Sequence, residues 1–139
     1  MLKWIMRVLP FLYMALIWTL SGLPHNAVVE LPDSAVDRFI KESLHLVEFG
    51  ILYVLLVLAV LTTGKLTPAV NILLAVFACF YGILDEIHQS FVPYRSATLI
   101  DAVKDITGVL VCWYFISRAL FQGRFKKLAF ILSYFKKGK

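Results

Sequence analysis

The segment 66–84 constrains the fold more than any other part of the chain, because its 19 residues include no charged side chain. A helix of about 20 apolar residues is long enough to cross the hydrocarbon core of a bilayer. Across the whole chain, 60% of the residues are hydrophobic and 17% are charged, whereas soluble domains are typically about half apolar and a quarter charged. A small globule cannot bury this excess. The sequence therefore predicts an integral membrane protein and disfavours a soluble enzyme.

Three further apolar segments accompany this one, at 8–23, 43–63 and 106–117. We interpret the first as an uncleaved helix, because the residues around Ser21 match a signal-peptide cleavage site poorly. At spanning length the four segments become about 4–23, 43–63, 66–86 and 100–121. We therefore predict an all-α fold: one membrane domain over 1–139, built as a four-helix bundle with short loops and ending in a basic tail at 122–139.

The distribution of charge predicts the orientation of this bundle. All nine acidic residues lie between Glu30 and Asp105. Ten of the 14 Lys and Arg residues lie before residue 8, in the turn at 64–68 or after residue 117, and four spans would bring these regions to one side of the membrane. Cytoplasmic loops are enriched in Lys and Arg. We expect both termini in the cytoplasm and the acidic side facing outward, and this sorting disfavours a nucleic-acid-binding surface.

The basic tail admits two interpretations. The apolar residues of the segment 125–135, FKKLAFILSYF, are flanked by paired lysines at both ends, as in an amphipathic helix that lies on an anionic inner leaflet. The alternative is a solvated basic tail that only sets the topology.

Polar residues gather at the outward ends of the predicted helices. Lys41, His45 and Glu48 have the i, i+4, i+7 spacing that places side chains on one helix face. Glu48 interrupts an apolar run, and a carboxylate in a span normally faces the bundle interior and finds a partner. Acids at a helix start are also favoured by the helix dipole alone. The predicted functional cluster consists of Lys41, His45, Glu48, Asp85, Glu86, His88, Gln89, Arg95, Asp101 and Asp105.

Three motifs in this set resemble the VanZ-like family of small bacterial membrane proteins, which is named for an accessory protein associated with teicoplanin resistance. They are Lys41-x3-His45-x2-Glu48, the run DEIHQSFVPYR at 85–95, and Asp101-x3-Asp105-x2-Gly108. The resemblance extends from about 21 to 108. It implies a multi-pass protein of the bacterial cytoplasmic membrane. The chain differs from the common family pattern at Tyr94, where Gly is usual, and at Asp105, where Asn is usual.

Three functions are compatible with these residues. In the one we favour, Arg95 and Lys41 contact the phosphate or carboxylate of an anionic lipid or lipid-linked wall precursor, with a possible consequence for glycopeptide susceptibility. The acids then hold the basic groups in place or bind sugar hydroxyls. The second is a metal-dependent intramembrane enzyme acting on a lipid head group, with a divalent cation held by carboxylate and imidazole groups. The third is a small proton-coupled transporter, which would need a homo-oligomer. We expect no cofactor and assign no catalytic residue.

Overall fold

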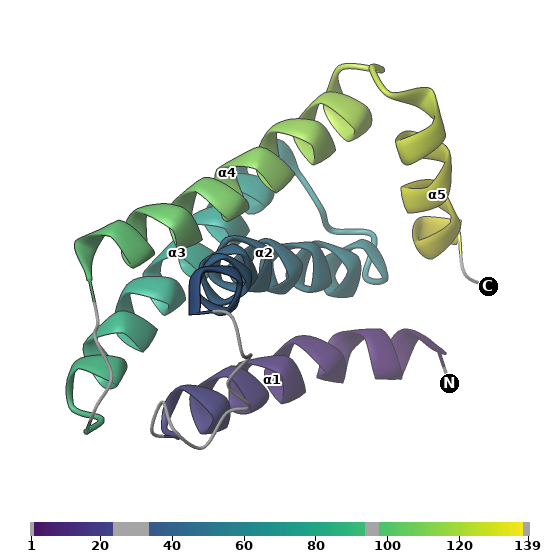
Figure 1. The fold of residues 1–139 in the computed structure, drawn as a ribbon. Coiled ribbons are helices and arrows are strands. Elements are labelled where there is room, and N and C mark those ends of the chain that lie inside the picture. Colours follow the sequence, from purple (N-terminus) through teal and green to yellow (C-terminus); the bar gives the residue numbers. More distant parts are fainter. Residues whose placement is uncertain (1, 24–33, 94–97, 138–139) are drawn as a thin grey trace.

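The computed structural model describes residues 2–23, 34–93 and 98–137, and these residues form five helices (Figure 1). They are α1 (Leu2–Ser21), α2 (Ser34–Leu61), α3 (Pro68–Ser90), α4 (Leu99–Phe121) and α5 (Lys126–Lys137). Within the described part of the chain there is no strand. The predicted all-α fold is confirmed for these residues.

The helix boundaries follow from local chemistry. Thr67 caps α3, because its side-chain oxygen accepts a hydrogen bond from the backbone N–H of Val70 at 3.2 Å, and Pro68 occupies the first helical turn, where its missing N–H costs nothing. Gly64 has a φ of 72° and ends the turn after α2, in a conformation that glycine adopts readily. The apolar segment expected at 43–63 falls in a longer helix, since α2 begins at Ser34. Similarly, α3 continues past 86 to Ser90.

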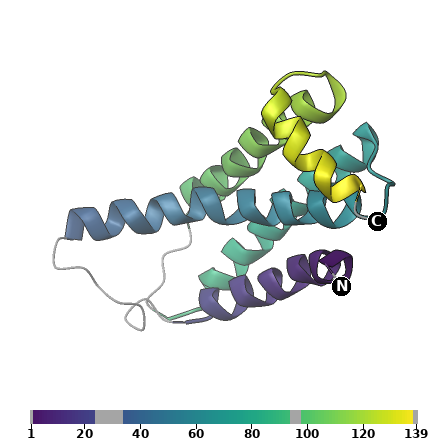
Figure 2. The same cartoon turned by 90° about the vertical axis from the view of Figure 1, so that its right-hand side faces the viewer.

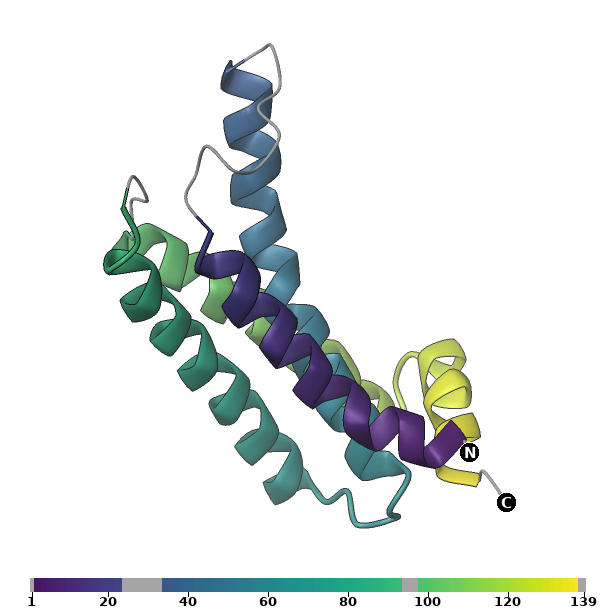
Figure 3. The same ribbon diagram turned by 90° about the horizontal axis from the view of Figure 1, so that it is seen from below.

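The helix α2 is the central element of the bundle and packs against α1, α3, α4 and α5. The start of α1, the turn between α2 and α3, and α5 lie at one end of the bundle (Figures 2 and 3). The end of α1, the end of α3 and the start of α4 lie at the opposite end, beyond which the first turns of α2 project (Figure 3). The fold thus gathers the basic chain segments at one end and the acidic ones at the other.

The core is built on the second half of α2, where Phe49, Leu52, Tyr53 and Val57 are fully buried. The outer faces of the bundle are apolar as well. Large exposed hydrophobic side chains on α1, α3 and α4 include Trp4, Phe11, Leu12, Leu73, Val76, Phe80, Val103, Leu110 and Val111. So many exposed large hydrophobic side chains are unusual for a soluble monomer.

Length and composition identify two candidate membrane spans among the described residues, Lys3–Ser21 and Pro68–Ser90. The apolar part of α2 is shorter, from Leu46 to Leu61. A signal sequence and the core helix of a soluble protein pass the same test, so these two helices are weak evidence for a membrane protein.

A chain of polar side chains, of which Tyr53 and Asn71 are buried, crosses the bundle nearer its basic end. The Tyr53 hydroxyl donates to Asn71 Oδ1 at 2.7 Å, and Asn71 Nδ2 donates to Ser117 Oγ at 2.8 Å. These contacts join α2, α3 and α4 through one fully buried amide. Such a satisfied polar group fixes the relative positions of the helices.

We expect Asn71→Ala to lower the free energy of unfolding by about 1–3 kcal/mol, because the substitution leaves the Tyr53 hydroxyl without its acceptor. Thermal unfolding of the detergent-solubilised protein measures the effect. Thr63→Ala is the matched control, because Thr63 is exposed and its hydroxyl contacts only the backbone of the turn after α2: it donates to the Val60 carbonyl and accepts from the Lys65 N–H. Equal melting temperatures for the two variants would contradict a structural role for this chain.

Candidate functional site

Four carboxylates from three helices lie at the end of the bundle opposite the basic segments, and we refer to them as the acidic cluster: Glu48, Asp85, Glu86 and Asp105. The side chains of Asp85, Glu86 and Asp105 are 0%, 7% and 1% exposed, and Glu48 is half-buried. Ionisable groups in such surroundings are costly unless they are paired or hydrogen-bonded. The four carboxylates therefore differ from ordinary surface charges, since their burial requires specific partners.

Asp85 is the most completely buried of the four, and one of its oxygens is fixed by two donors. Asp85 Oδ2 accepts a hydrogen bond from Ser21 Oγ at 2.8 Å and another from Gln89 Nε2 at 2.5 Å. The Ser21 contact ties the end of α1 to α3. The other oxygen, Asp85 Oδ1, is equally buried and accepts no hydrogen bond from the described residues. A buried acceptor in this state is costly.

Two tyrosines lie near Glu48, and one of them, Tyr81, also lies near Asp85. The Tyr81 hydroxyl donates to the Met14 carbonyl at 2.8 Å, and Tyr81 lies within electrostatic range of both the Asp85 and the Glu48 carboxylates. The Tyr13 hydroxyl donates to the backbone carbonyl of Glu48 at 3.3 Å. Glu48 and Asp85 therefore approach the same region between α1, α2 and α3.

Asp105 reaches the cluster because α3 carries a glycine where the two helices touch. A Cβ placed on Gly82 would lie 3.3 Å from the Asp105 β-carbon and 3.5 Å from the Phe49 ring. Asp105 therefore packs directly against the backbone of α3. Glu86 follows Gly82 by about one helical turn. Glu86 and Asp105 therefore occupy neighbouring positions between α3 and α4.

A second glycine contact brings α4 against α2. A Cβ on Gly108 would lie 2.9 Å from the backbone carbonyl carbon of Leu46 and closer still to its oxygen. Opposite it, a Cβ on Gly50 would lie 3.2 Å from the Gly108 carbonyl oxygen. The backbones of α2 and α4 thus touch just beside Glu48, and this contact positions α2 relative to Asp105.

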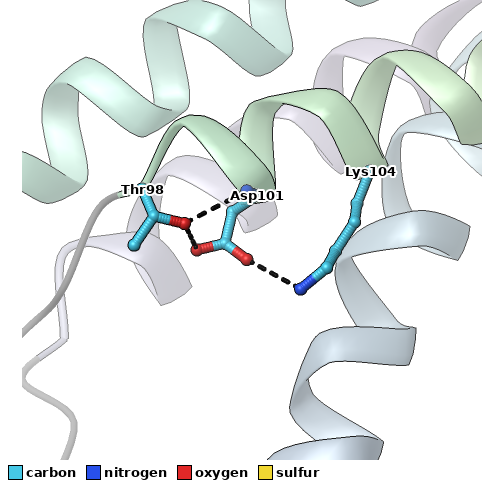
Figure 4. Close-up of polar contacts among 3 residues, drawn as sticks. All are labelled: Thr98, Asp101 and Lys104. Carbon is cyan, nitrogen blue, oxygen red and sulfur yellow. Dashed lines mark hydrogen bonds and ion pairs between the residues drawn. The ribbon is translucent and has the colours of Figure 1, made fainter.

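Asp101 has a different environment at the start of α4 (Figure 4). Its carboxylate accepts from Thr98 Oγ1 at 2.6 Å and from Lys104 Nζ at 3.1 Å, and its backbone N–H donates to Thr98 Oγ1 at 3.2 Å. This is a capping arrangement, in which a Thr side chain and an acid satisfy the first turn of a helix. The local contacts of Asp101 are those of a helix start.

The remaining predicted residues divide into one that the structure places and three whose side chains it does not describe. His88 stacks on Trp18 with ring centroids 3.9 Å apart and planes 6° from parallel, so it packs the end of α3 against α1. Lys41 and His45 belong to α2 by their backbone, but their side chains lie outside the described part of the structure. Arg95 also lies outside the described residues. The roles of these three residues remain predictions from the sequence.

Within the described residues, no group of three or more His, Cys, Asp or Glu side chains has the geometry to hold a metal ion. The carboxylates of the acidic cluster instead lie where α3 packs against its three neighbours, α1, α2 and α4. This arrangement offers hydrogen-bond acceptors in a buried setting.

Sequence reasoning missed three residues of this site: Ser21, Tyr81 and Gly82. Ser21 lies more than 60 positions from its partner Asp85, and Tyr81 and Gly82 are part of the apolar run. The spacing of Tyr81, one turn before Asp85 on the same helix face, is the signal that could have identified it.

Comparison with known proteins identifies one family. A family model described as VanZ/LLP1 matches residues 3–122, which include α1, α2, α3 and α4. Searches of curated proteins and of solved structures give no match. The match covers most of the chain and agrees with the resemblance seen in the motifs that carry the acidic cluster, so the chain belongs to the VanZ/LLP1 family.

Proposed function

We propose that the protein is a multi-pass protein of the bacterial cytoplasmic membrane, with α1–α4 as spans and both termini in the cytoplasm. The apolar outer faces of α1, α3 and α4 support this arrangement, because lipid is the solvent that such faces require. The sorting of charge supports the orientation, since the basic segments share the end that holds the start of α1 and α5. The acidic cluster then lies toward the outer leaflet.

In this proposal the outward end binds an anionic lipid or a lipid-linked cell-wall precursor. The observation that carries it is the buried carboxylate of Asp85, which is held by Ser21 and Gln89 through one oxygen and has the other oxygen free of donors from the described residues. A sugar or glycerol hydroxyl supplies the missing donor. Arg95 and Lys41 supply the phosphate contact, for which the guanidinium fork is well suited.

A ligand held in this way is partly withdrawn from agents that act on it from outside. We therefore propose that the protein affects the susceptibility of the cell to glycopeptides of the teicoplanin type. Deletion of the gene, followed by a susceptibility profile across wall-directed antibiotics, tests this consequence. We expect the susceptibility of the deletion strain to lipoglycopeptides to change severalfold and to return to the wild-type value when the gene is supplied again.

The complementing variants make this test specific. An Asp85→Asn gene is expected to leave the shift uncorrected, whereas Asp101→Asn is expected to restore the wild-type profile, because Asp101 serves the cap of α4. Unchanged susceptibility of the deletion strain to every wall-directed agent would contradict the proposed consequence.

A further inference from the structure

The connection between α4 and α5 forms a groove at the basic end of the bundle, opposite the acidic cluster. The groove has a volume of about 350 Å³ and is lined by Phe115, Phe125, Lys126, Lys127 and Leu128. The rings of Phe115 and Phe125 meet edge to face, with centroids 5.1 Å apart. Two exposed lysines thus stand beside a wall of three apolar side chains.

A sharp turn beside this groove leads from α4 into α5. Gly123 has a φ of 65° and Phe125 a φ of 54°, so the chain reverses sharply after α4. The backbone N–H of Arg124 donates to the Arg118 carbonyl at 3.0 Å, which fixes the turn against the last part of α4. The turn thus brings Phe125 and the start of α5 beside Phe115 of α4.

The helix α5 presents two different apolar faces. Leu132 is buried in the core and Leu128 packs against it, so this face belongs to the bundle. Phe130, Ile131 and Tyr134 lie on another face and are exposed, Phe130 by 78% and Tyr134 by 71%. Helical spacing places them in one stripe. An amphipathic helix with an exposed aromatic stripe and neighbouring lysines is typical of one that lies in the membrane interface.

The positive charge of the basic end favours an anionic lipid over a zwitterionic one. Besides the two lysines of the groove, the basic end carries further Lys and Arg residues and no acidic residue: Lys3, Arg7, Lys65, Arg118, Arg124 and Lys136. A basic residue beside the head group of an anionic lipid contributes about 1 kcal/mol of attraction, so Lys126 and Lys127 give most of the selectivity of the groove, and the other basic residues attract the leaflet as a whole. A zwitterionic lipid offers the same acyl chains without this attraction.

We propose that the groove binds one anionic phospholipid of the leaflet that faces the basic end. Its phosphate contacts Lys126 and Lys127, and an acyl chain lies along Phe115, Phe125 and Leu128. The stripe on α5 lies at the level of the head groups beside it. This site is separate from the acidic cluster, and it gives the C-terminal helix a binding role in addition to its contribution to topology.

Native mass spectrometry of the full-length protein tests this site, with phosphatidylglycerol and phosphatidylcholine of equal chain length as probes. We expect the wild-type protein to bind phosphatidylglycerol more tightly. The double variant Lys126→Gln/Lys127→Gln should bind phosphatidylglycerol about 10- to 30-fold more weakly, which corresponds to about 1 kcal/mol for each lysine. Its affinity for phosphatidylcholine should not change.

The double variant Lys3→Gln/Lys65→Gln is the matched control, because it removes the same charge from the same end of the bundle but outside the groove. It should retain nearly all of the phosphatidylglycerol affinity. Three results would overturn the proposal: equal losses in the two double variants, equal affinities of the wild-type protein for the two lipids, or competition by glycerol phosphate as effective as that by the intact lipid. The last would identify a simple anion site.

Discussion

The substitution Gly108→Ala is expected to destabilise the bundle by about 3 kcal/mol, the upper end of the usual cost of overpacking. A methyl group at this position would overlap the backbone carbonyl of Leu46. Backbone atoms in the middle of two helices cannot move aside as the end of a flexible side chain can. The helices α2 and α4 must then separate, and the contacts around Glu48 and Asp105 separate with them.

Thermal unfolding in detergent measures this effect, together with the yield of monodisperse protein. Gly22→Ala is the matched control, because a Cβ there meets its neighbours at 3.4–3.5 Å, an ordinary van der Waals distance. We expect its effect to be below about 1 kcal/mol, as for most surface changes. If Gly108→Ala melts at the same temperature as the control, the close contact between α2 and α4 is wrong.

The second large effect is expected for ligand binding by Asp85→Asn. Asparagine keeps the shape of the side chain, and its oxygen still accepts from Ser21 and Gln89. Its amide nitrogen, however, replaces Asp85 Oδ1, so a donor stands where the ligand needs an acceptor. We expect the affinity for a lipid-linked wall precursor to fall by about 10- to 100-fold, the range for a lost hydrogen bond to a charged group.

This change in affinity is measured on purified protein in nanodiscs, beside the melting temperature of each variant. Asp101→Asn removes the same charge from the neighbouring helix start and should leave the affinity near the wild-type value. A loss of the same size in both variants would mean that net charge alone governs binding, and the role of Asp85 in the proposal would then be withdrawn.

Much of the fold could be predicted from the sequence, because its signals are local. The uncharged run at 66–84 specifies α3, and the glycine and proline residues around 64–68 specify the turn before it. The family was predictable for the same reason, since the run DEIHQSFVPYR lies in one continuous segment. The extension of α2 to Ser34 was not predictable from hydropathy, because those first turns are polar and project beyond the neighbouring helices.

The acidic residues of the site could be predicted from the sequence, but their contacts with other helices could not. The contact between Ser21 and Asp85 joins residues from different helices, and no periodicity along the chain encodes it. Packing also separates residues that share a motif. Asp101 and Asp105 lie one turn apart, yet Asp101 bonds with Thr98 and Lys104 at the helix start, whereas Asp105 is buried against Gly82. The difference follows from their positions along α4: Asp101 lies in its first turn, and Asp105 lies one turn further on, where α3 packs against it.

The central claim is that the ligand binds at the end of the bundle that carries the acidic cluster. The most direct test is photo-crosslinking of the full-length protein in nanodiscs with a lipid-linked wall precursor that carries a diazirine on its sugar, followed by peptide mapping. The proposal predicts label in the end of α1, the end of α3 and the start of α4, lost when unlabelled precursor is added. Label confined to the basic end, or label that unlabelled precursor does not displace, would contradict it.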